Sequence, residues 1–234
     1  MSRLYPVVIL AGGLATRLQP LTQSIPKSLV DIHGKPFIYH QLTLLKKQGV
    51  QHVILCIGHL GEQIKDYVQE GADFGLQVDY STDGQRLLGT AGAIKRALPL
   101  VGPYFMVIHG DSYLNCDLYS VQAAFQRSHR LALMTVYRNH DQWDKSNIEF
   151  SEGEILNYDK INQTKLMQHI DYGLGVFNQA AFEPIPDNEP YDLALLYQTL
   201  LKQKQLASYE IQNRFYEVGS FSGINDLKQF ILST

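Results

Sequence analysis

A pair of adjacent glycines with two basic residues close behind it is the clearest chemical signal in this sequence. Gly12 and Gly13 follow a short apolar run, and Arg17 and Lys27 come soon after them. Adjacent glycines let backbone N–H groups approach and wrap a chain of phosphates, and the two cations can neutralise its charge. No Gly-Lys-Ser/Thr follows and no GxGxxG occurs, so neither of those phosphate-loop patterns is present. The glycine pair alone is equally compatible with an ordinary turn between a strand and a helix.

A carboxylate follows the most apolar stretch of the first half. The run from Tyr104 to Ile108 leads into His109-Gly110-Asp111, so we expect Asp111 at the carboxyl end of a strand, where ligands bind in open α/β sheets. His109 has apolar neighbours, and we interpret it as a packed histidine rather than a general base. The eight histidines show no HxxxH or HExxH spacing, and no Gly-x-Ser-x-Gly elbow occurs. Zinc hydrolysis and serine nucleophilic catalysis therefore have no support.

Short apolar runs alternate with segments of helical periodicity in the first half of the chain. The predicted strands are 7–10, 52–57, 77–80 and 104–108. The predicted helices are a segment that ends near Gly49, a segment over 62–68, and a segment that begins near Thr90. The alternation predicts βαβ units and a mainly parallel sheet covered on both faces, which is an α/β fold.

The second half of the chain, from residue 131, has α+β character. Its predicted strands are 131–137, 148–150, 174–177 and 206–211, and its predicted helices are 192–202 and 223–232. No internal repeat, low-complexity tract or linker marks a second domain. We therefore expect residues 1–234 to form one domain.

Composition and charge restrict the class of protein. The 234 residues are 45% hydrophobic and 18% charged, which is ordinary for a folded globular chain. The net charge of −3 and the lack of a Lys/Arg run argue against a nucleic-acid partner. Cys56 and Cys116 are far apart and suggest neither a disulfide framework nor a zinc site. The apolar run near the N-terminus is too short for a signal segment or a membrane span, so we expect a cytoplasmic protein without a membrane partner.

Four segments in order resemble the sugar 1-phosphate nucleotidyltransferase family. Its signature LAGGxGTRLxPLT...PK is matched by Leu10 to Thr22 and Pro26-Lys27, with Ala15 in place of a glycine. The other matching segments are Gly34-Lys35-Pro36, Leu88-Gly89-Thr90-Ala91-Gly92-Ala93 and Gly110-Asp111-Ser112. The resemblance implies a Rossmann-like, mainly parallel but mixed sheet flanked by helices, of the glycosyltransferase-A-like kind. It also implies Mg²⁺-dependent joining of an NTP to a sugar 1-phosphate, with release of pyrophosphate.

The resemblance assigns the nucleotide and the metal to particular residues. It implies that the nucleotide is bound by Leu10, Ala11, Gly12 and Gly13, with Thr82 and Gly89 beside the base. Arg17 would hold the departing pyrophosphate and Lys27 the reacting phosphates, both as catalytic residues. Asp111 would be catalytic and a ligand of Mg²⁺. Glu217 stands where the family carries an aspartate as the second ligand, and a glutamate reaches one methylene further.

The resemblance also assigns residues to the sugar phosphate. Asp159-Lys160 stands where the family carries a Glu-Lys pair, so Asp159 would accept a sugar hydroxyl and Lys160 would be a catalytic residue that pairs with the sugar phosphate. Asp171 replaces an asparagine before Gly173 in a segment that binds the sugar, and Asn147 precedes a strand at a place where relatives often have a glycine that lies against the sugar ring. Without the resemblance, Asp159-Lys160 would be interpreted as an exposed ion pair and Asn147 as a polar loop residue.

The resemblance leaves the substrates open. We expect residues from 1 to about 130 to bind the nucleotide and those from about 131 to 234 to bind the sugar phosphate, in a monomer or small homo-oligomer. The sequence looks most like the D-glycero-D-manno-heptose 1-phosphate guanylyltransferases, which favours GTP with a heptose or hexose 1-phosphate. The alternatives are transfer to MurNAc 1-phosphate or another phosphorylated acceptor with UTP or CTP, and a non-catalytic nucleotide-sugar sensor.

Overall fold

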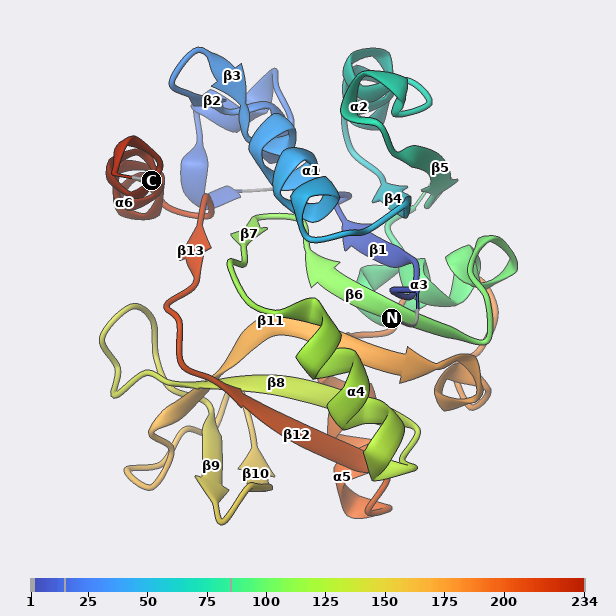
Figure 1. The fold of residues 1–234 in the computed structure, drawn as a ribbon, viewed down its shortest axis with the longest axis vertical. Coiled ribbons are helices and arrows are strands. Elements are labelled where there is room, and N and C mark those ends of the chain that lie inside the picture. Colours follow the sequence, from blue (N-terminus) through green and yellow to red (C-terminus); the bar gives the residue numbers. More distant parts are fainter. Residues whose placement is uncertain (1–2, 15, 85, 234) are drawn as a thin grey trace.

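A mixed sheet of nine strands lies at the centre of the computed structural model, which describes residues 3–14, 16–84 and 86–233 (Figure 1). Its strands are β1 (Val7–Leu10), β4 (His52–Ile57), β5 (Gln77–Thr82), β6 (Tyr104–His109), β8 (Ala132–Arg138), β9 (Ile148–Ser151), β10 (Glu154–Tyr158), β11 (His169–Asn178) and β12 (Leu206–Ile211). The order β10-β9-β11-β6-β1-β4-β5 forms the main path, and β8 joins β11 to β12. The sheet contains strands from both halves of the sequence.

The parallel part of the sheet ends between β6 and β11. Strands β6, β1, β4 and β5 are mutually parallel, as the alternation of strands and helices predicted. Strand β11 runs antiparallel to β6, and its Leu174 lies opposite Ile108. The start of β11 therefore lies next to the carboxyl end of β6, where His109 leads into Asp111.

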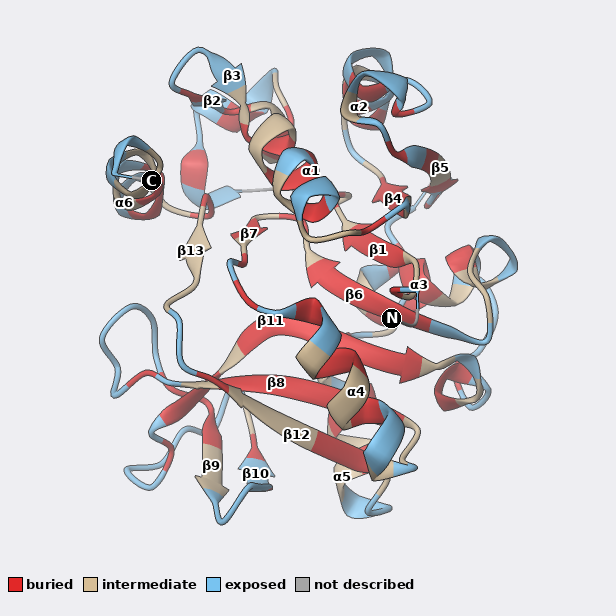
Figure 2. Cartoon of the chain, viewed as in Figure 1, coloured by how far each residue is buried: buried red, intermediate tan, exposed pale blue. Residues whose placement is uncertain are grey.

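Helices cover both faces of the sheet, which explains why its central strands are almost uniformly apolar. The α-helices are α1 (Phe37–Lys47), α2 (Gly61–Val68), α3 (Gly89–Ala97), α4 (Leu118–Ser128), α5 (Leu193–Lys202) and α6 (Phe221–Leu232). Apolar side chains of α1, α2 and α4 pack with Val7 and Ile9 on one face, whereas those of α3 and α5 pack with Val8 on the other. Figure 2 shows the resulting buried interior along β6, β8 and β11.

Short elements complete the chain around the sheet. The strands β2 (Asp31–Ile32) and β3 (Lys35–Pro36) form one hairpin, and β7 (Ser112–Tyr113) pairs with β13 (Tyr216–Glu217). A third apolar cluster, which includes Leu18, Phe37 and Val218, lies beneath α6. The 3₁₀ turns are η1 (Thr16–Leu18), η2 (Leu21–Gln23), η3 (Lys27–Leu29), η4 (Ala72–Phe74), η5 (Leu98–Leu100) and η6 (Gln179–Phe182).

The α/β class and the mainly parallel, mixed sheet are confirmed. The strands at 7–10, 52–57 and 206–211 have the predicted bounds, and Gly49 follows α1 with φ +95°, the left-handed conformation that often ends a helix. The strand predicted over 174–177 is longer, because β11 begins at His169. Among the α-helices and the strands of the nine-stranded sheet, α4 and β10 were not predicted.

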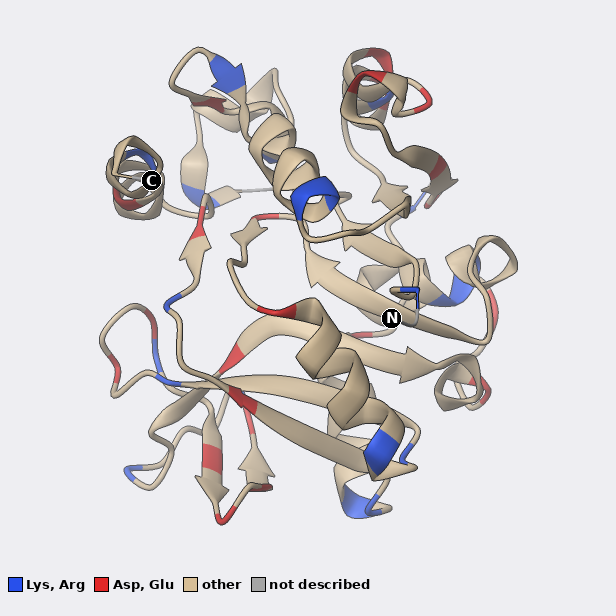
Figure 3. Ribbon diagram, in the orientation of Figure 1, with Lys and Arg blue, Asp and Glu red and all other residues tan. Residues whose placement is uncertain are grey.

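Two global properties follow from the distribution of side chains. Within the described residues, no helix combines the length and the apolar character needed to cross a membrane. Acidic and basic residues are interspersed over the ribbon in Figure 3.

Candidate active site

Glycines bring the ends of three parallel strands into contact. A Cβ atom at Gly110, after β6, would overlap with the Leu10 carbonyl oxygen, and the Gly110 N–H donates to that oxygen at 3.1 Å. A Cβ atom at Gly12 would lie 3.1 Å from the backbone nitrogen of Gly58, after β4. The loop after β1 is thus fixed between its two neighbours, at the sheet edge where ligands bind in such folds.

The glycine loop faces a cavity of about 230 Å³. Leu10, Ala11 and Gly13 line this cavity, and a Cβ atom at Gly13 would meet nothing within 4 Å. Gly12 does not line it, because it packs on Gly58. Ala15, which stands in place of a glycine of the family signature, lies outside the described residues.

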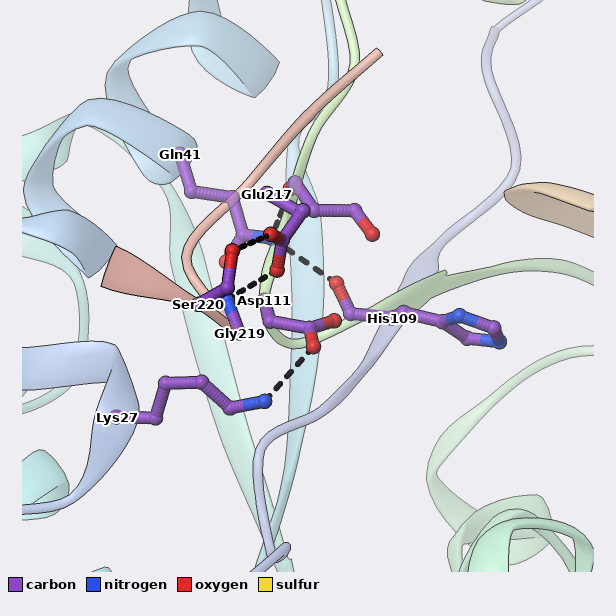
Figure 4. Close-up of polar contacts among 8 residues, drawn as sticks. Lys27, Gln41, His109, Asp111, Glu217, Gly219 and Ser220 are labelled. Carbon is purple, nitrogen blue, oxygen red and sulfur yellow. Dashed lines mark hydrogen bonds and ion pairs between the residues drawn. The ribbon is translucent and has the colours of Figure 1, made fainter. Parts of the chain in front are cut away.

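Lys27 and Asp111 form an ion pair at the floor of the site. Lys27 Nζ donates to Asp111 Oδ2 at 2.7 Å, and the side chains are 21% and 24% exposed, so both remain accessible (Figure 4). Burial is the largest effect and tends to raise the pKa of Asp111, but the Lys27 ammonium, the nearby His109 and the hydrogen bonds to the carboxylate together outweigh burial and hold the pKa below its usual value. Asp111 is therefore an anion at neutral pH, next to a cation that phosphate groups could also bind.

Glu217 approaches the same point from β13, but its carboxylate is bonded to its own loop. Its two oxygens accept from the Gly219 N–H and, at 2.6 Å, from the Ser220 hydroxyl (Figure 4). A Cβ atom at Gly219 would lie 3.2 Å from both Arg17 Nη2 and Asp111 Oδ2 and would overlap with a Glu217 oxygen. The sequence-distant residues Arg17, Asp111 and Glu217 therefore converge on the space that Gly219 leaves free.

A second cavity of about 680 Å³ adjoins the first. Four residues line both cavities, namely His109, Asp111, Lys160 and Asp171. The second cavity is also lined by Arg17, Asn147, Gly173 and Glu217. The two hollows thus form one cleft whose middle carries two carboxylates and a lysine, which suits two phosphorylated substrates that meet there.

Residues predicted to bind the sugar form a connected segment of this cleft. Asn147 Oδ1 accepts from the Asp171 N–H at 3.1 Å, and Asp171 Oδ1 accepts from the Gly173 N–H at 3.0 Å. Gly173 has φ +94°, and a Cβ atom there would lie 3.0 Å from Ser112 Oγ, so glycine is needed for the close approach to the segment after Asp111.

Three predicted residues lie away from the two cavities. Asp159 is bonded within its own loop, where it accepts from the N–H groups of Ile161 and Asn162 at 2.7 and 2.9 Å, and these bonds lower its pKa. Thr82 is exposed at the end of β5. Gly89 begins α3 with φ +69°, and a Cβ atom there would lie 2.7 Å from the Tyr191 carbonyl oxygen.

The cleft also contains residues that the sequence did not single out. Tyr158, Tyr197 and Asp192 line the smaller cavity. In the larger one, the Arg214 guanidinium carbon lies 3.2 Å from the Trp143 ring centroid. Tyr158 could have been found, because it directly precedes Asp159-Lys160, but no local pattern marks Tyr197. His109 also lines both cavities, although its ring points away from the ion pair of Asp111 in Figure 4.

The carboxylates of Asp111 and Glu217 are the candidate ligands for a metal ion. Among the described residues, no three His, Cys, Asp or Glu side chains group closely enough to hold one. Mg²⁺ needs fewer protein ligands, since it is commonly bound by one or two carboxylates together with substrate phosphates and water. Two carboxylates that border one free space beside a phosphate-binding loop fit that pattern.

Comparison with known proteins assigns this arrangement to a family. The sequence model of the nucleotidyl transferases matches residues 6–234, which is nearly the whole chain. The chain belongs to the nucleotidyl transferase family. The resemblance to sugar 1-phosphate nucleotidyltransferases is thereby confirmed.

Curated relatives of this nucleotidyl transferase act on several sugar phosphates. It is 40% identical over 111 residues to a D-glycero-α-D-manno-heptose 1-phosphate guanylyltransferase of Campylobacter jejuni, covering 47% of this chain and 49% of the relative. It is 39% identical over 125 residues to an N-acetylmuramate α-1-phosphate uridylyltransferase of Neisseria meningitidis, covering 53% of each. A UTP–glucose-1-phosphate uridylyltransferase of Synechocystis is 28% identical over 202 residues, 80% of this chain and 52% of the relative. The chain thus spans about half the length of these relatives.

Solved structures share the fold over nearly their whole length. HddC from Yersinia pseudotuberculosis, solved with GMP-PN, has a TM-score of 0.80 and 26% identity, covering 97% of this chain and 99% of its own. A putative glucose-1-phosphate thymidylyltransferase from Bacillus anthracis has a TM-score of 0.85 and 20% identity, covering 96% and 94%. The nucleotidyl transferase fold of this chain is therefore established.

Proposed function

We propose that this nucleotidyl transferase joins an NTP to a sugar 1-phosphate and releases pyrophosphate. The observation that carries the proposal is the continuity of the cleft: the glycine loop lines one cavity, Arg17 and Glu217 line the other, and Asp111 and Lys160 line both. A reaction between two phosphate groups needs such a meeting point, with cations that screen the anions from each other.

The proposed nucleotide site is the loop after β1. The backbone of Leu10 to Gly13 would bind the nucleotide, with Gly12 securing the loop on Gly58, and with Thr82 and Gly89 beside the base. The guanylyltransferase of Campylobacter jejuni and the GMP-PN complex of HddC support GTP as the donor. The Neisseria meningitidis relative supports UTP as the alternative.

The proposed sugar-phosphate site is the segment that contains Asn147, Asp171 and Gly173, together with Lys160. Lys160 would pair with the phosphate of the acceptor, since it lines both parts of the cleft. Asp159 would stabilise the loop that carries Lys160 through its bonds to Ile161 and Asn162. Heptose or hexose 1-phosphates are the proposed acceptors, with MurNAc 1-phosphate as the alternative.

The reaction requires no protein nucleophile, because the attacking phosphate oxygen is already ionised. It attacks the α-phosphorus in line with the departing pyrophosphate, so alignment and neutralisation of charge provide the catalysis. Lys27 would leave Asp111 to bind the reacting phosphates, and Arg17 would bind the pyrophosphate. Asp111 and Glu217 would hold Mg²⁺, which when bound supplies further neutralisation of phosphate charge.

The decisive experiment is a screen of the four NTPs against a panel of sugar 1-phosphates, with pyrophosphate release as the readout. We expect magnesium-dependent release with one nucleotide and a narrow set of acceptors, and none with Asp111→Asn. The self-bonded carboxylate of Glu217 favours one competing function, a sensor that binds nucleotide sugars without turnover. Binding of a nucleotide sugar without pyrophosphate release in any combination would support the sensor and contradict the proposal.

A further inference from the structure

The smaller cavity is lined by two tyrosines to which the proposed mechanism gives no role. Tyr158 comes from the end of β10 and Tyr197 from α5, and both line the cavity together with Asp171 of β11 and the glycine loop. The rings of Tyr158 and Tyr197 pack edge to face, with centroids 6.0 Å apart. Three different elements thus contribute two tyrosines and an aspartate to the lining of one small cavity.

Among the described residues, neither phenol has a hydrogen-bond partner at ordinary distance. The hydroxyl oxygen of Tyr158 is buried, and the polar group that acts on it is the nearby Asp171 carboxylate. No described residue bonds to the Tyr197 hydroxyl either, and Tyr197 is 2% exposed. Burial, followed by the Asp171 charge, raises the pKa of both phenols, so both stay protonated. Buried hydroxyls that lack partners destabilise a protein, and those that face a cavity are available to a ligand.

The backbone of β11 makes room for one of these hydroxyls. A Cβ atom at Gly175 would overlap with the Tyr197 hydroxyl oxygen and would lie 2.8 Å from Phe177 Cε2. Gly175 lies within β11 and has no positive φ, so its backbone conformation does not require glycine. The space that a side chain would fill on β11 is occupied by the hydroxyl of Tyr197 from α5. The absence of that side chain therefore lets the helix present its hydroxyl beside Asp171.

We infer that Tyr158, Asp171 and Tyr197 form a subsite that binds the ring hydroxyls of the acceptor sugar. The inference rests on the proposed function and specifies its substrate class: a pyranose 1-phosphate with free, uncharged hydroxyls on the ring edge that enters the cavity. Asp171 can only accept hydrogen bonds, whereas phenols donate and accept, which matches a set of sugar hydroxyls.

The position of Lys160 assigns this subsite to the acceptor rather than to the ribose of the nucleotide. Lys160 follows Tyr158 by two residues, and its Nζ lies 5.9 Å from the Tyr158 ring centroid. A phosphate held by Lys160 therefore places its attached sugar next to Tyr158. The glycine loop, which would hold the nucleotide, also lines this cavity, so the acceptor sugar would enter it beside the nucleotide.

The test uses Tyr158→Phe and Tyr197→Phe, each of which removes one oxygen. Pyrophosphate release is measured with the best NTP and sugar 1-phosphate from the screen, with each substrate varied in turn. We expect each variant to raise the KM for the sugar phosphate about 3- to 10-fold, the worth of one hydrogen bond, and to leave the KM for the NTP unchanged. Deoxy analogues of that sugar phosphate, each lacking one hydroxyl, are then compared. For one of them the rise in KM seen with wild type should be smaller in a variant, because the variant has already lost the contact to that hydroxyl.

Two controls separate contact with the sugar from a structural role. Tyr137→Phe removes a hydroxyl from a tyrosine that packs on the opposite face of the sheet and should change neither KM. The melting temperature of Tyr158→Phe should equal or exceed that of wild type, since the lost hydroxyl has no hydrogen-bond partner at ordinary distance among the described residues. If Tyr197→Phe folds poorly, Asp171→Asn provides the same test, because its amide oxygen can still accept from Gly173 and the carboxylate is lost.

The possible outcomes are distinct. An unchanged KM for the sugar phosphate in all three variants would overturn the subsite while leaving the proposed reaction intact. A rise in the KM for the NTP alone would overturn it by assigning the phenols to the ribose. Failure of every NTP and sugar phosphate pair in wild type would overturn the proposed function, and the subsite with it.

Discussion

At the scale of single residues, Lys27 and Asp111 form a pair whose partners have different tasks. Each side chain is about a fifth to a quarter exposed, so phosphate groups that enter the cleft can compete for the lysine. Arg17 stands across the space beside Gly219 and can reach the same region. The resting ion pair thus keeps the aspartate ionised and the lysine in position for an anion.

Removal of either cation should reduce catalysis and spare the fold. We expect Arg17→Ala and Lys27→Ala each to lower kcat/KM by an amount equivalent to about 2–4 kcal/mol, as when one preorganised electrostatic group is deleted. Steady-state pyrophosphate release and a thermal melt measure the two effects. Lys35→Ala is the matched control, since Lys35 contacts Tyr39 outside the two cavities. Wild-type turnover in both variants would show that neither cation contributes to catalysis.

Substitution of Glu217 tests the second proposed ligand. Glu217→Gln keeps the length of the side chain and one acceptor oxygen for the loop, but it loses the charge that a magnesium ion requires. We expect loss of magnesium-dependent turnover, with metal-free nucleotide binding retained in a calorimetric titration. Ser220→Ala controls for damage to the loop, because it removes a partner of Glu217 and the cap of α6 and keeps the carboxylate. Full activity in Glu217→Gln would leave Asp111 as the single protein ligand.

The lowered pKa of Asp111 predicts how the ion pair responds to acid. The pKa of Asp111 is lower in the folded protein than the value of about 3.9 expected in the unfolded chain. The ionised carboxylate therefore contributes its full stabilisation above about pH 3.9, and this stabilisation is lost as the pH falls through the folded-state pKa. In Lys27→Ala, burial acts without the ammonium, so this loss on acidification should disappear. Urea unfolding at a series of pH values below about 5 should show wild-type stability falling more steeply than that of the variant. Parallel curves for the two proteins would contradict the coupling.

At the scale of elements, buried parallel strands were the easiest to predict from sequence. A strand covered on both faces is almost uniformly apolar, as β1 is throughout and β4 is after His52, so its bounds can be recognised from its own residues. Strand β10 was missed because its register shifts between Ile155 and Asn157, which breaks the two-residue alternation. Helix α4 had a usable signal in the cap residue Asp117, followed by an apolar face.

The contact between α5 and β11 predicts a specific coupling of two substitutions. Gly175→Ala should destabilise the protein by about 1–3 kcal/mol, the usual cost of overpacking, because the new methyl overlaps with the Tyr197 hydroxyl. Tyr197→Phe in the same chain should recover part of that loss, since it removes the nearest atom. Denaturant unfolding of the four proteins in the cycle measures the coupling.

Gly102→Ala is the matched control for Gly175→Ala. It should destabilise the protein much less than Gly175→Ala, because a Cβ atom at Gly102 meets nothing within 4 Å and the φ of Gly102 is not positive. Additive effects of the two changes at Gly175 and Tyr197 would mean that the helix and the strand adjust independently.

At the scale of the whole molecule, the candidate site divides into a part that sequence could predict and a part that it could not. Residues at the ends of parallel strands, such as Gly12 and Asp111, could be placed because the sheet brings such ends to one edge. Tyr197 could not, since its role depends on how α5 crosses Gly175. The direction of the Asp159 side chain was likewise set by its own loop. Sequence pattern thus captured what the sheet determines and missed what side-chain packing determines.

The reversal of strand direction between β6 and β11 has a consequence for how such a protein could be re-engineered. One edge of β6 contacts β1, whose loop faces the proposed nucleotide site, and its other edge contacts β11, which carries Asp171 and Gly173. The proposed nucleotide and acceptor sites would therefore lie on separate stretches of chain, on either side of β6. We expect a graft that exchanges the segment from β8 to α5, which contains both Asp171 and Tyr197, for that of a relative to change the acceptor preference and to leave the nucleotide preference unchanged.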